Sequence, residues 1–321
     1  MEELSAVPTK KSYNLMFHGN GMEYFGIVIV NWFLTAITLG FYYPWAKAKQ
    51  LQYMYGSTEL NNDRFSFHGT GKEMFKGFIK AIIIFGIIYG IFWTLFVLEM
   101  PNLGILFLYL SILAITPIAI HGSYRYRMSR SSWRGIRFGY RGDRKELTIN
   151  FFKWLLFTIL SIGLYSSWFA VNLRKFILGN VKLGSIRFNY EADGGDYFLL
   201  NLKGYFLTII TLGIYMFWWQ KELFEFYINN ISLHKDEQKI ELKSTATGGG
   251  FFGLMFLNLL ILVFTLGLGY AWIEMRTMKY ITENIVLEGD IDLDTIQQTE
   301  ESYNDATGDD MSDMLDINFI V

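Results

Sequence analysis

One short motif recurs four times along the chain, and it constrains the fold more than any other feature of the sequence. A Thr-Leu-Gly or Ser-Ile-Gly triplet is followed by a tryptophan five residues after the glycine, and by a leucine fifteen residues after the tryptophan. The glycines and tryptophans are Gly40 and Trp45, Gly163 and Trp168, Gly213 and Trp218, and Gly267 and Trp272. The leucines are Leu60, Leu183, Leu233 and Leu287. Ungapped copies at one spacing indicate a supersecondary unit that is used repeatedly.

The composition indicates a membrane environment. Of the 321 residues, 52% are apolar and 18% are charged, whereas about 25% of residues are charged in a soluble domain. The net charge of −2 gives no overall basic field that would attract nucleic acid. The chain has no cysteine, which excludes disulfides, thiolate catalysis and cysteine-ligated metals. Residues 1–11 contain no apolar stretch typical of a cleaved signal peptide, so we expect the first apolar run to direct insertion.

Six apolar segments are each close to the ~20 residues that cross a hydrocarbon core of ~30 Å. They cover residues 24–45, 75–98, 103–120, 150–171, 198–219 and 251–273. The second and third are uninterrupted and are joined by a short turn at residues 99–102, whereas the repeated motif punctuates the other four. After each tryptophan, apolar residues recur every three or four positions with charges between them, which predicts an amphipathic helix.

Each unit ends in the alternating pattern of a β-hairpin, most clearly at Val181–Tyr190. Similar patterns occupy residues 60–67, 133–140, 231–242 and 285–293. The predicted fold class is therefore a membrane, mainly α-helical multi-pass protein with internal repeats and small water-facing β-hairpins after each helical unit. We expect a polar N-terminal lead (1–14), a repeat-built membrane domain (15–295) and an acidic disordered tail (296–321). The predicted repeat units are 15–68, 69–142, 143–190, 191–242 and 243–295.

Two topologies are compatible with this pattern. In one, each of the six apolar segments crosses the membrane once. In the other, short helices enter, turn at the Gly motif and leave through the tryptophan helix, so that every β-hairpin lies on one side. We favour the second, because it places the basic stretch 121–149 and the other cations together in the cytoplasm, as the positive-inside rule prefers.

The basic stretch also contains the candidate ligand contacts. Its arginines include Arg125, Arg127, Arg130, Arg134 and Arg137. We interpret them first as a solvated face that sets orientation, and the sharper alternative is contact with anionic lipid headgroups. The repeated tryptophans are expected to anchor at the interface or to pack between repeats, and ligand stacking is the less favoured alternative.

The sequence predicts no catalytic residues, no metal site and no cofactor. The four histidines, His18, His68, His121 and His234, lack the spacing of metal ligands on a helix. Lys153 and Lys203 lie within apolar segments, where we expect their side chains to extend to the interface. The prediction is therefore that the protein is not an enzyme.

Three motifs resemble the YjgN-like family, which comprises bacterial inner-membrane proteins of unknown function. They occupy residues 17–25, 38–47 and 133–142, and the resemblance extends over about residues 15–290. Ser161, Ile162 and Gly269 depart from the family pattern, and the acidic tail is not part of the resemblance. The resemblance implies a multi-pass protein of the bacterial inner (plasma) membrane and supplies no activity.

The function predicted from these features is a non-enzymatic inner-membrane protein that binds or transports a small or lipidic ligand between its repeats. The alternative is an envelope-organising or sensing protein that binds a partner through cytoplasmic hairpins or through the acidic tail. The lipid bilayer is the expected partner, nucleic acid is not, and the sequence identifies no protein partner.

Overall fold

A computed structural model describes residues 11–299 of the chain. The described part contains ten α-helices: α1 (Gly21–Ile37), α2 (Tyr43–Ser57), α3 (Gly71–Val97), α4 (Pro101–Arg130), α5 (Arg144–Leu160), α6 (Ser166–Gly179), α7 (Gly194–Ile210), α8 (Met216–Asn229), α9 (Gly248–Phe264) and α10 (Tyr270–Glu283). It also contains ten strands: β1 (Lys11–Phe17), β2 (Thr58–Leu60), β3 (Asp63–Phe67), β4 (Ser131–Trp133), β5 (Ile136–Tyr140), β6 (Val181–Leu183), β7 (Ile186–Tyr190), β8 (Ile231–Lys235), β9 (Gln238–Ser244) and β10 (Ile285–Gly289). Five times, an antiparallel pair of helices is followed by a strand.

The strands form one closed antiparallel barrel in the order β1-β10-β9-β8-β7-β6-β5-β4-β3-β2. Four β-hairpins supply eight strands, and β1 pairs with β10, with Lys11 opposite Gly289. The predicted hairpin at residues 285–293 is therefore wrong, as is the boundary of the polar lead, because residues 11–14 belong to β1. A separate β-hairpin is only marginally stable, and its edge strands expose unpaired backbone N–H and C=O groups. Closing the barrel pairs every strand on both sides and so removes both problems.

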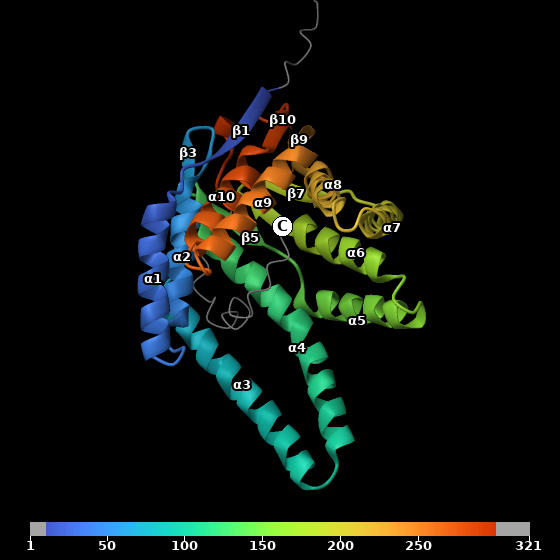
Figure 1. Cartoon of the computed structure of the whole chain (residues 1–321). Coiled ribbons are helices and arrows are strands. Elements are labelled where there is room, and N and C mark those ends of the chain that lie inside the picture. Colours follow the sequence, from blue (N-terminus) through green and yellow to red (C-terminus); the bar gives the residue numbers. More distant parts are fainter. Residues whose placement is uncertain (1–10, 300–321) are drawn as a thin grey trace, which may run out of the picture.

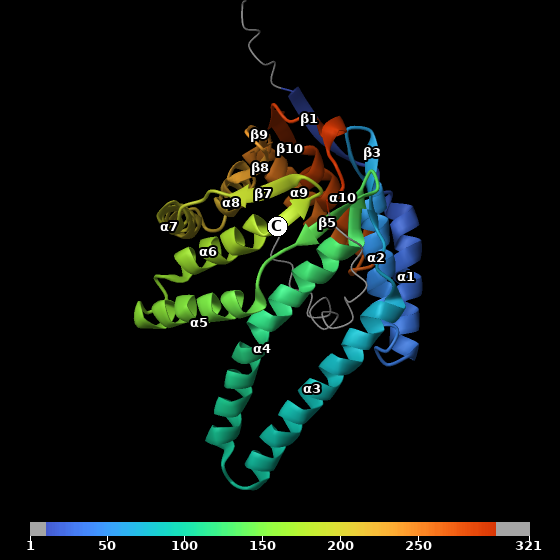
Figure 2. The same cartoon turned by 180° about the vertical axis from the view of Figure 1, so that it is seen from behind.

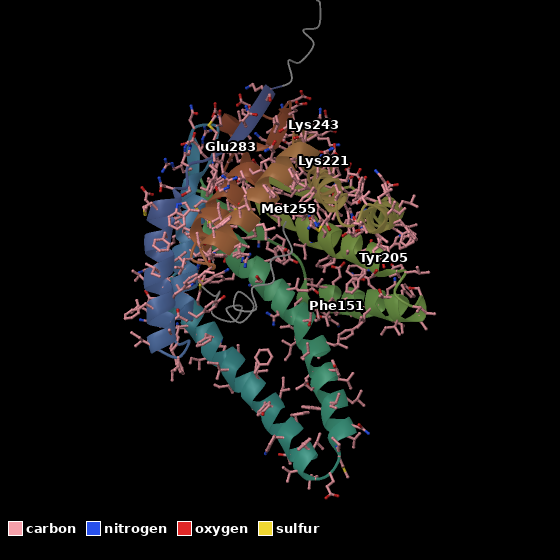
Figure 3. The ribbon with its side chains drawn as sticks, viewed as in Figure 1. Phe151, Tyr205, Lys221, Lys243, Met255 and Glu283 are labelled. Carbon is pink, nitrogen blue, oxygen red and sulfur yellow. The ribbon has the colours of Figure 1, made fainter. Side chains whose placement is uncertain are left out.

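The predicted fold class is wrong in a second respect. Within the described residues, only α3 and α4 are both long and apolar enough to cross a membrane. The structure is thus a closed barrel that carries helical hairpins, of which one is long (Figures 1 and 2; the side chains are drawn in Figure 3), and not the predicted mainly α-helical multi-pass protein with separate small β-hairpins. The two views agree that the α3–α4 hairpin extends furthest from the barrel.

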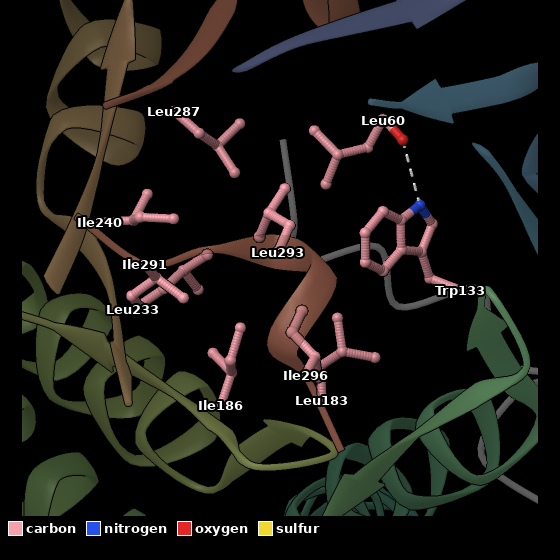
Figure 4. Close-up of a cluster of buried hydrophobic side chains, with 10 residues drawn as sticks. All are labelled: Leu60, Trp133, Leu183, Ile186, Leu233, Ile240, Leu287, Ile291, Leu293 and Ile296. Carbon is pink, nitrogen blue, oxygen red and sulfur yellow. Dashed lines mark hydrogen bonds between the residues drawn. The ribbon is translucent and has the colours of Figure 1, made fainter. Parts of the chain in front are cut away.

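The leucines of the repeated motif meet inside the barrel. Leu60, Leu183, Leu233 and Leu287 are buried there, and Trp133 occupies the corresponding position in the remaining β-hairpin (Figure 4). The indole Nε1 of Trp133 donates to the carbonyl oxygens of Leu60 (3.3 Å) and Asp63 (3.1 Å). The motif leucines therefore share the interior with side chains of other strands, including Ile186 of β7 and Ile240 of β9.

A C-terminal segment closes one end of the barrel. The helices all join the strands at one end, here called the helix end, and the hairpin turns lie at the other, the turn end. Residues 290–299, here called the cap, lie at the turn end and insert Ile291, Leu293 and Ile296 into the core (Figure 4). Ile296 is buried, so the prediction of a disordered tail is wrong for residues 296–299, and the rest of that prediction, residues 300–321, lies outside the described residues.

Hydrogen bonds and an ion pair hold the cap on several strands. The Asp290 N–H donates to the Lys239 carbonyl (3.0 Å), and the Ser185 N–H donates to the Gln297 carbonyl (3.0 Å). Lys11 Nζ donates to the Asp292 carboxylate at 2.8 Å. This hydrogen bond lowers the pKa of Asp292 below its usual value and raises that of Lys11. The cap therefore ties the two terminal strands to the hairpins across the barrel.

The repeated triplet forms the turn at the tip of each short helical hairpin. Thr38 shows the geometry: its Oγ1 donates to the Leu34 carbonyl (2.7 Å) and accepts the Tyr42 N–H (2.9 Å). The next two residues have positive φ, 50° at Leu39 and 92° at Gly40, and glycine tolerates this conformation best. The helix therefore ends at the triplet and the chain returns towards the barrel. All four short hairpins do this, so each apolar segment that contains the motif is broken into two helices and does not form one continuous helix.

Neighbouring hairpins meet through a tryptophan–glycine contact. Four helices begin with a glycine that lies under the motif tryptophan of a neighbouring hairpin: Gly71 under Trp45, Gly194 under Trp168, Gly248 under Trp218, and Gly21 under Trp272. A Cβ at any of these glycines would lie less than 3.0 Å from the indole. The last of these contacts joins α1 to α10 and so helps to close the ring of hairpins.

Candidate ligand cavity

A cavity of about 570 Å³ lies between α1, α2 and α10. This is within the range of 300–1,000 Å³ that is usual for small-molecule sites. One part of its lining is polar and contains Tyr24, Asn31, Lys47 and Gln50. The other part is apolar and extends to the hairpin tip at Leu39 and Gly40, with Trp32 and Tyr270 on its walls. The cavity is therefore amphipathic along its length.

The polar part is organised around Glu274 of α10. Tyr24 Oη donates to one carboxylate oxygen and Gln50 Nε2 donates to the other, both at 2.8 Å. These bonds connect the first helical hairpin with the last. Glu274 and Lys47 occupy the same position in their units, two residues after Trp272 and Trp45. Lys47 thus lines the cavity, while Glu274, at the equivalent position of the last hairpin, holds the lining residues Tyr24 and Gln50.

Asn31 is the polar group in this cavity with unused hydrogen-bonding capacity. Its side chain is 7% exposed, and its Nδ2 donates a long hydrogen bond to the Ala46 carbonyl (3.4 Å). Its Oδ1 is buried and has no hydrogen-bond partner among the described residues. Such an acceptor costs about 1–3 kcal/mol. A ligand that donates a hydrogen bond here would remove that cost.

Lys47 adds a cation to the same part of the cavity. Its side chain is also only 7% exposed. Ionisable groups among apolar helices often mark binding sites. A cation and a buried acceptor beside apolar walls suit an amphiphile that carries a negative charge and a hydrogen-bond donor.

A second, apolar cavity of about 300 Å³ lies at the helix end of the barrel. Leu15, Phe65 and Phe138 of the strands line it together with Met54, Met128 and Met278 of the helices. It lies between the barrel core and the helices, and its thioether side chains adapt readily to different apolar shapes. Its walls offer little polar recognition.

The five arginines predicted to contact lipid do not form one surface. Arg130 pairs with Glu73 (3.0 Å). Arg134 pairs with both Asp63 and the cap residue Asp294, and the backbone N–H of Arg137 donates to Gln298. Arg125 lies apart from these, on α4 near the start of α5. Arg127 is on α4 as well, and one Nη atom of its guanidinium is buried. Arg130 and Arg134 therefore hold elements of the protein together.

The other predicted residues have structural contacts. Gly40 lines the cavity, while Gly163, Gly213 and Gly267 form the corresponding tips. His18 contacts Glu59, His68 contacts Ser132, and His234 contacts Ser232. Lys203 pairs with Glu222. Within residues 11–299, no group of three or more His, Cys, Asp or Glu side chains could hold a metal ion.

The sequence patterns did not identify Asn31, Lys47, Gln50 and Glu274 as candidate site residues. The available signal was that equivalent positions of the first and last units carry Lys47 and Glu274, whose charges are opposite. Only closure of the ring brings those units together.

The structure is that of a closed barrel with helical hairpins, one of which is long and apolar enough to cross a membrane, and with a candidate ligand cavity. The chain belongs to the family described as "Bacterial protein of unknown function (DUF898)", which matches residues 12–203 and 217–314. It is similar to the inner membrane protein YjgN of Salmonella typhimurium, with 31% identity over 182 residues, which is 55% of this chain and 44% of the relative. The YjgN protein of Escherichia coli is 32% identical over 161 residues, which is 49% of this chain and 38% of the relative.

The chain thus spans less than half the length of these curated relatives. No solved structure matches it. The predicted membership of a YjgN-like family of bacterial inner-membrane proteins is confirmed.

Proposed function

We propose that this chain is a non-enzymatic inner-membrane protein, built from five repeats of a helical hairpin and a strand pair, that binds an amphiphilic ligand. The ligand lies between the first and last helical hairpins, in the cavity lined by Asn31 and Lys47. The observation that carries the proposal is the buried Oδ1 of Asn31, which has no hydrogen-bond partner among the described residues.

The hairpin tips support a particular placement in the membrane. Leu39, Ile162, Leu212 and Leu266 are 89–95% exposed at the four short tips. Such isolated apolar side chains on a protruding turn suit insertion into hydrocarbon. The fifth tip carries Glu99, whose φ is 60°, but the following residue, Met100, has a φ of −112° instead of the positive φ of the motif glycine. In this proposal, the short hairpins enter the membrane without crossing it, and α3–α4 crosses and exposes Glu99 to water on the far side.

Helix lengths and charges agree with this placement. At 1.5 Å per residue, the 27 residues of α3 span about 40 Å, whereas the 17 residues of α1 span about 25 Å. A hydrocarbon core is ~30 Å thick. No Lys or Arg lies between Lys80 and Arg125, or within residues 25–46. The positive-inside rule then puts the barrel and the basic stretch 121–149 in the cytoplasm.

The cavity suits a lipid with an anionic, hydroxyl-bearing headgroup. Lys47 would attract the negative charge, Asn31 Oδ1 would accept from the hydroxyl, and the walls towards Leu39 would hold the apolar chain. Because the cavity reaches the hairpin tip, a lipid could enter it from the bilayer. Transport would also require the ligand to leave the cavity towards another compartment. Ligand binding is therefore the first step, both for a protein that only binds the ligand and for one that transports it.

Native mass spectrometry of the purified full chain in mild detergent tests this proposal. We expect the protein to retain an amphiphile, and Asn31→Leu and Lys47→Met to weaken its binding about tenfold or more, as expected for hydrogen bonds to charged or buried groups. Asn258→Leu is the matched control, since Asn258 has the equivalent position in α9 but both its amide atoms already have partners. Equal retention by Asn31→Leu and Asn258→Leu would refute the assignment of the cavity.

The cap favours partner binding as a second candidate function. Residues 290–299 fix the start of the acidic C-terminal segment at the turn end of the barrel, away from the membrane in this placement. A partner with a basic surface could then bind the barrel and that segment together. Deleting residues 300–321 separates the two functions: a ligand-binding protein keeps its bound amphiphile, whereas an adaptor loses its partner in a pull-down.

A further inference from the structure

One junction between neighbouring hairpins lacks the tryptophan–glycine contact. Counting fifteen residues back from Trp133, the barrel residue of this unit, leads to Ile118, where the other units have tryptophan. The next helix, α5, begins with Arg144 in place of the glycine that begins α1, α3, α7 and α9. A large aromatic contact is therefore replaced by a smaller apolar side chain and a cation.

A recess of about 650 Å³ lies at this junction, between α4 and α5. Three cationic side chains line it: Arg125 from α4, and Arg144 and Lys145 from α5. The carboxylate of Asp143 also lines the recess, where its Oδ1 accepts the Glu146 N–H at 2.7 Å and so caps α5. The charged side chains lining the recess therefore sum to +2, and the capping hydrogen bond of α5 is already made by the protein.

Two buried side chains, His121 and Tyr140, support the wall of the recess. His121 is 2% exposed, and its Nε2 donates to the Gly142 carbonyl at 2.9 Å. Its ring meets Tyr140 edge-on, with centroids 5.4 Å apart. Burial raises the pKa of Tyr140, which keeps its phenol neutral. These contacts hold the loop at Gly142, which leads directly into the first turn of α5, where Arg144 and Lys145 lie.

The recess lies where α4 leaves its apolar section. Ile118 and Ile149 on its edge are exposed apolar side chains. Arg125 lies seven residues beyond Ile118, or about 10 Å along the helix. The headgroup region adds about 5–8 Å to each side of the hydrocarbon core. Arg125 thus lies slightly more than one headgroup depth from an apolar side chain that suits acyl chains.

We propose that this recess binds the phosphate of an anionic phospholipid, with Arg125, Arg144 and Lys145 around the phosphate and Ile118 and Ile149 against the acyl chains. This site differs from the cavity at Asn31 in position and in chemistry, so either can exist without the other. Guanidinium groups bind phosphate oxygens in a planar, two-pronged geometry, and lysine contributes a point charge. Free inorganic phosphate shares the headgroup's chemistry but would not use the apolar edge.

Titration of the delipidated full chain in detergent tests the proposal, with phosphatidylglycerol, phosphatidylcholine and inorganic phosphate as probes. We expect phosphatidylglycerol to bind more tightly than phosphatidylcholine. Arg125→Gln and Lys145→Gln should each weaken it about fivefold, and the double variant about 25-fold. Lys175→Gln is the matched control, because Lys175 is an equally charged, exposed residue on the neighbouring helix α6.

The outcomes separate the possible sources of the phosphate. Arg125→Lys should restore much of the binding that Arg125→Gln loses, which a merely misfolded variant would not show. If inorganic phosphate binds with the same dependence on Arg125 and phosphatidylglycerol does not, the site is for a soluble anion and the lipid assignment is overturned. Equal binding of phosphatidylglycerol to the Lys145→Gln and Lys175→Gln variants would overturn the site itself.

Discussion

Replacing Gly248 with alanine tests the contact that joins neighbouring hairpins. A Cβ at Gly248 would lie less than 3.0 Å from both Cδ1 and Nε1 of Trp218. At the next residue, Gly249, a Cβ would meet no atom within 4 Å. The two glycines lie in the first turn of α9, so Gly249→Ala is a control with the same chemical change and almost the same place.

The expected cost follows from overpacking. Forcing a methyl group into a filled contact typically costs about 1–3 kcal/mol. A change of 1 kcal/mol shifts the Tm by roughly 2–4 °C in a domain of 150–250 residues, so Gly248→Ala should lower the Tm by about 2–10 °C. Gly249→Ala should leave it unchanged or raise it slightly, because alanine favours helix more than glycine does.

Thermal unfolding of the purified protein in detergent, followed by tryptophan fluorescence, measures both variants. A double variant with Trp218→Leu should recover part of the loss, since removing the indole makes room for the methyl group. If Gly248→Ala and Gly249→Ala both have the same Tm as the wild type, the Trp218 indole can move aside without cost. The contact between Trp218 and Gly248 would then not stabilise the packing of neighbouring hairpins.

Two further predictions concern the cap. Leu293→Ala should destabilise the protein by about 2–5 kcal/mol, because Leu293 is 3% exposed inside the barrel, and an unchanged urea midpoint would contradict this. Asp292 has a pKa below its usual 3.8 because Lys11 donates to it. The ion pair between Lys11 and Asp292 therefore stabilises the cap fully above the usual pKa of 3.8. This stabilisation is lost as the pH falls through the lowered pKa of Asp292 in the folded protein. Lys11→Met should make the urea midpoint less dependent on pH between about 4 and 2, and an identical pH profile would rule out the pair.

Local features were predictable from the sequence because their causes are local. The triplet at Thr38 predicted a turn, since a positive φ favours glycine and a threonine hydroxyl can bond to the helix backbone. The alternation of apolar and polar residues on both sides of Gly184 and Ser185 predicted a β-hairpin, because successive side chains of a strand point to opposite faces. Each of these depends on residues only a few positions apart.

Ring closure was not predictable in the same way. β1 and β10 pair although nearly the whole described chain separates them, and no local pattern names the partner of a strand. The fifteen-residue spacing identified Leu60 and Leu287 as equivalent but gave no reason for them to meet. Asn31 and Tyr270 line one cavity, and Tyr24 bonds to Glu274, only because the first and last hairpins are neighbours in the ring.

The most direct test of the whole account is the sidedness of the hairpins, and the absence of native cysteine makes it simple. Single cysteines are placed at Asn62 and Glu237, in two β-hairpin turns, and at Glu99, at the tip of α3–α4. Intact cells are then labelled with a membrane-impermeant maleimide. The account predicts that Glu99→Cys is labelled from outside, whereas Asn62→Cys and Glu237→Cys are labelled only after lysis. Labelling of one turn position but not the other in intact cells would contradict a single barrel on one side of the membrane.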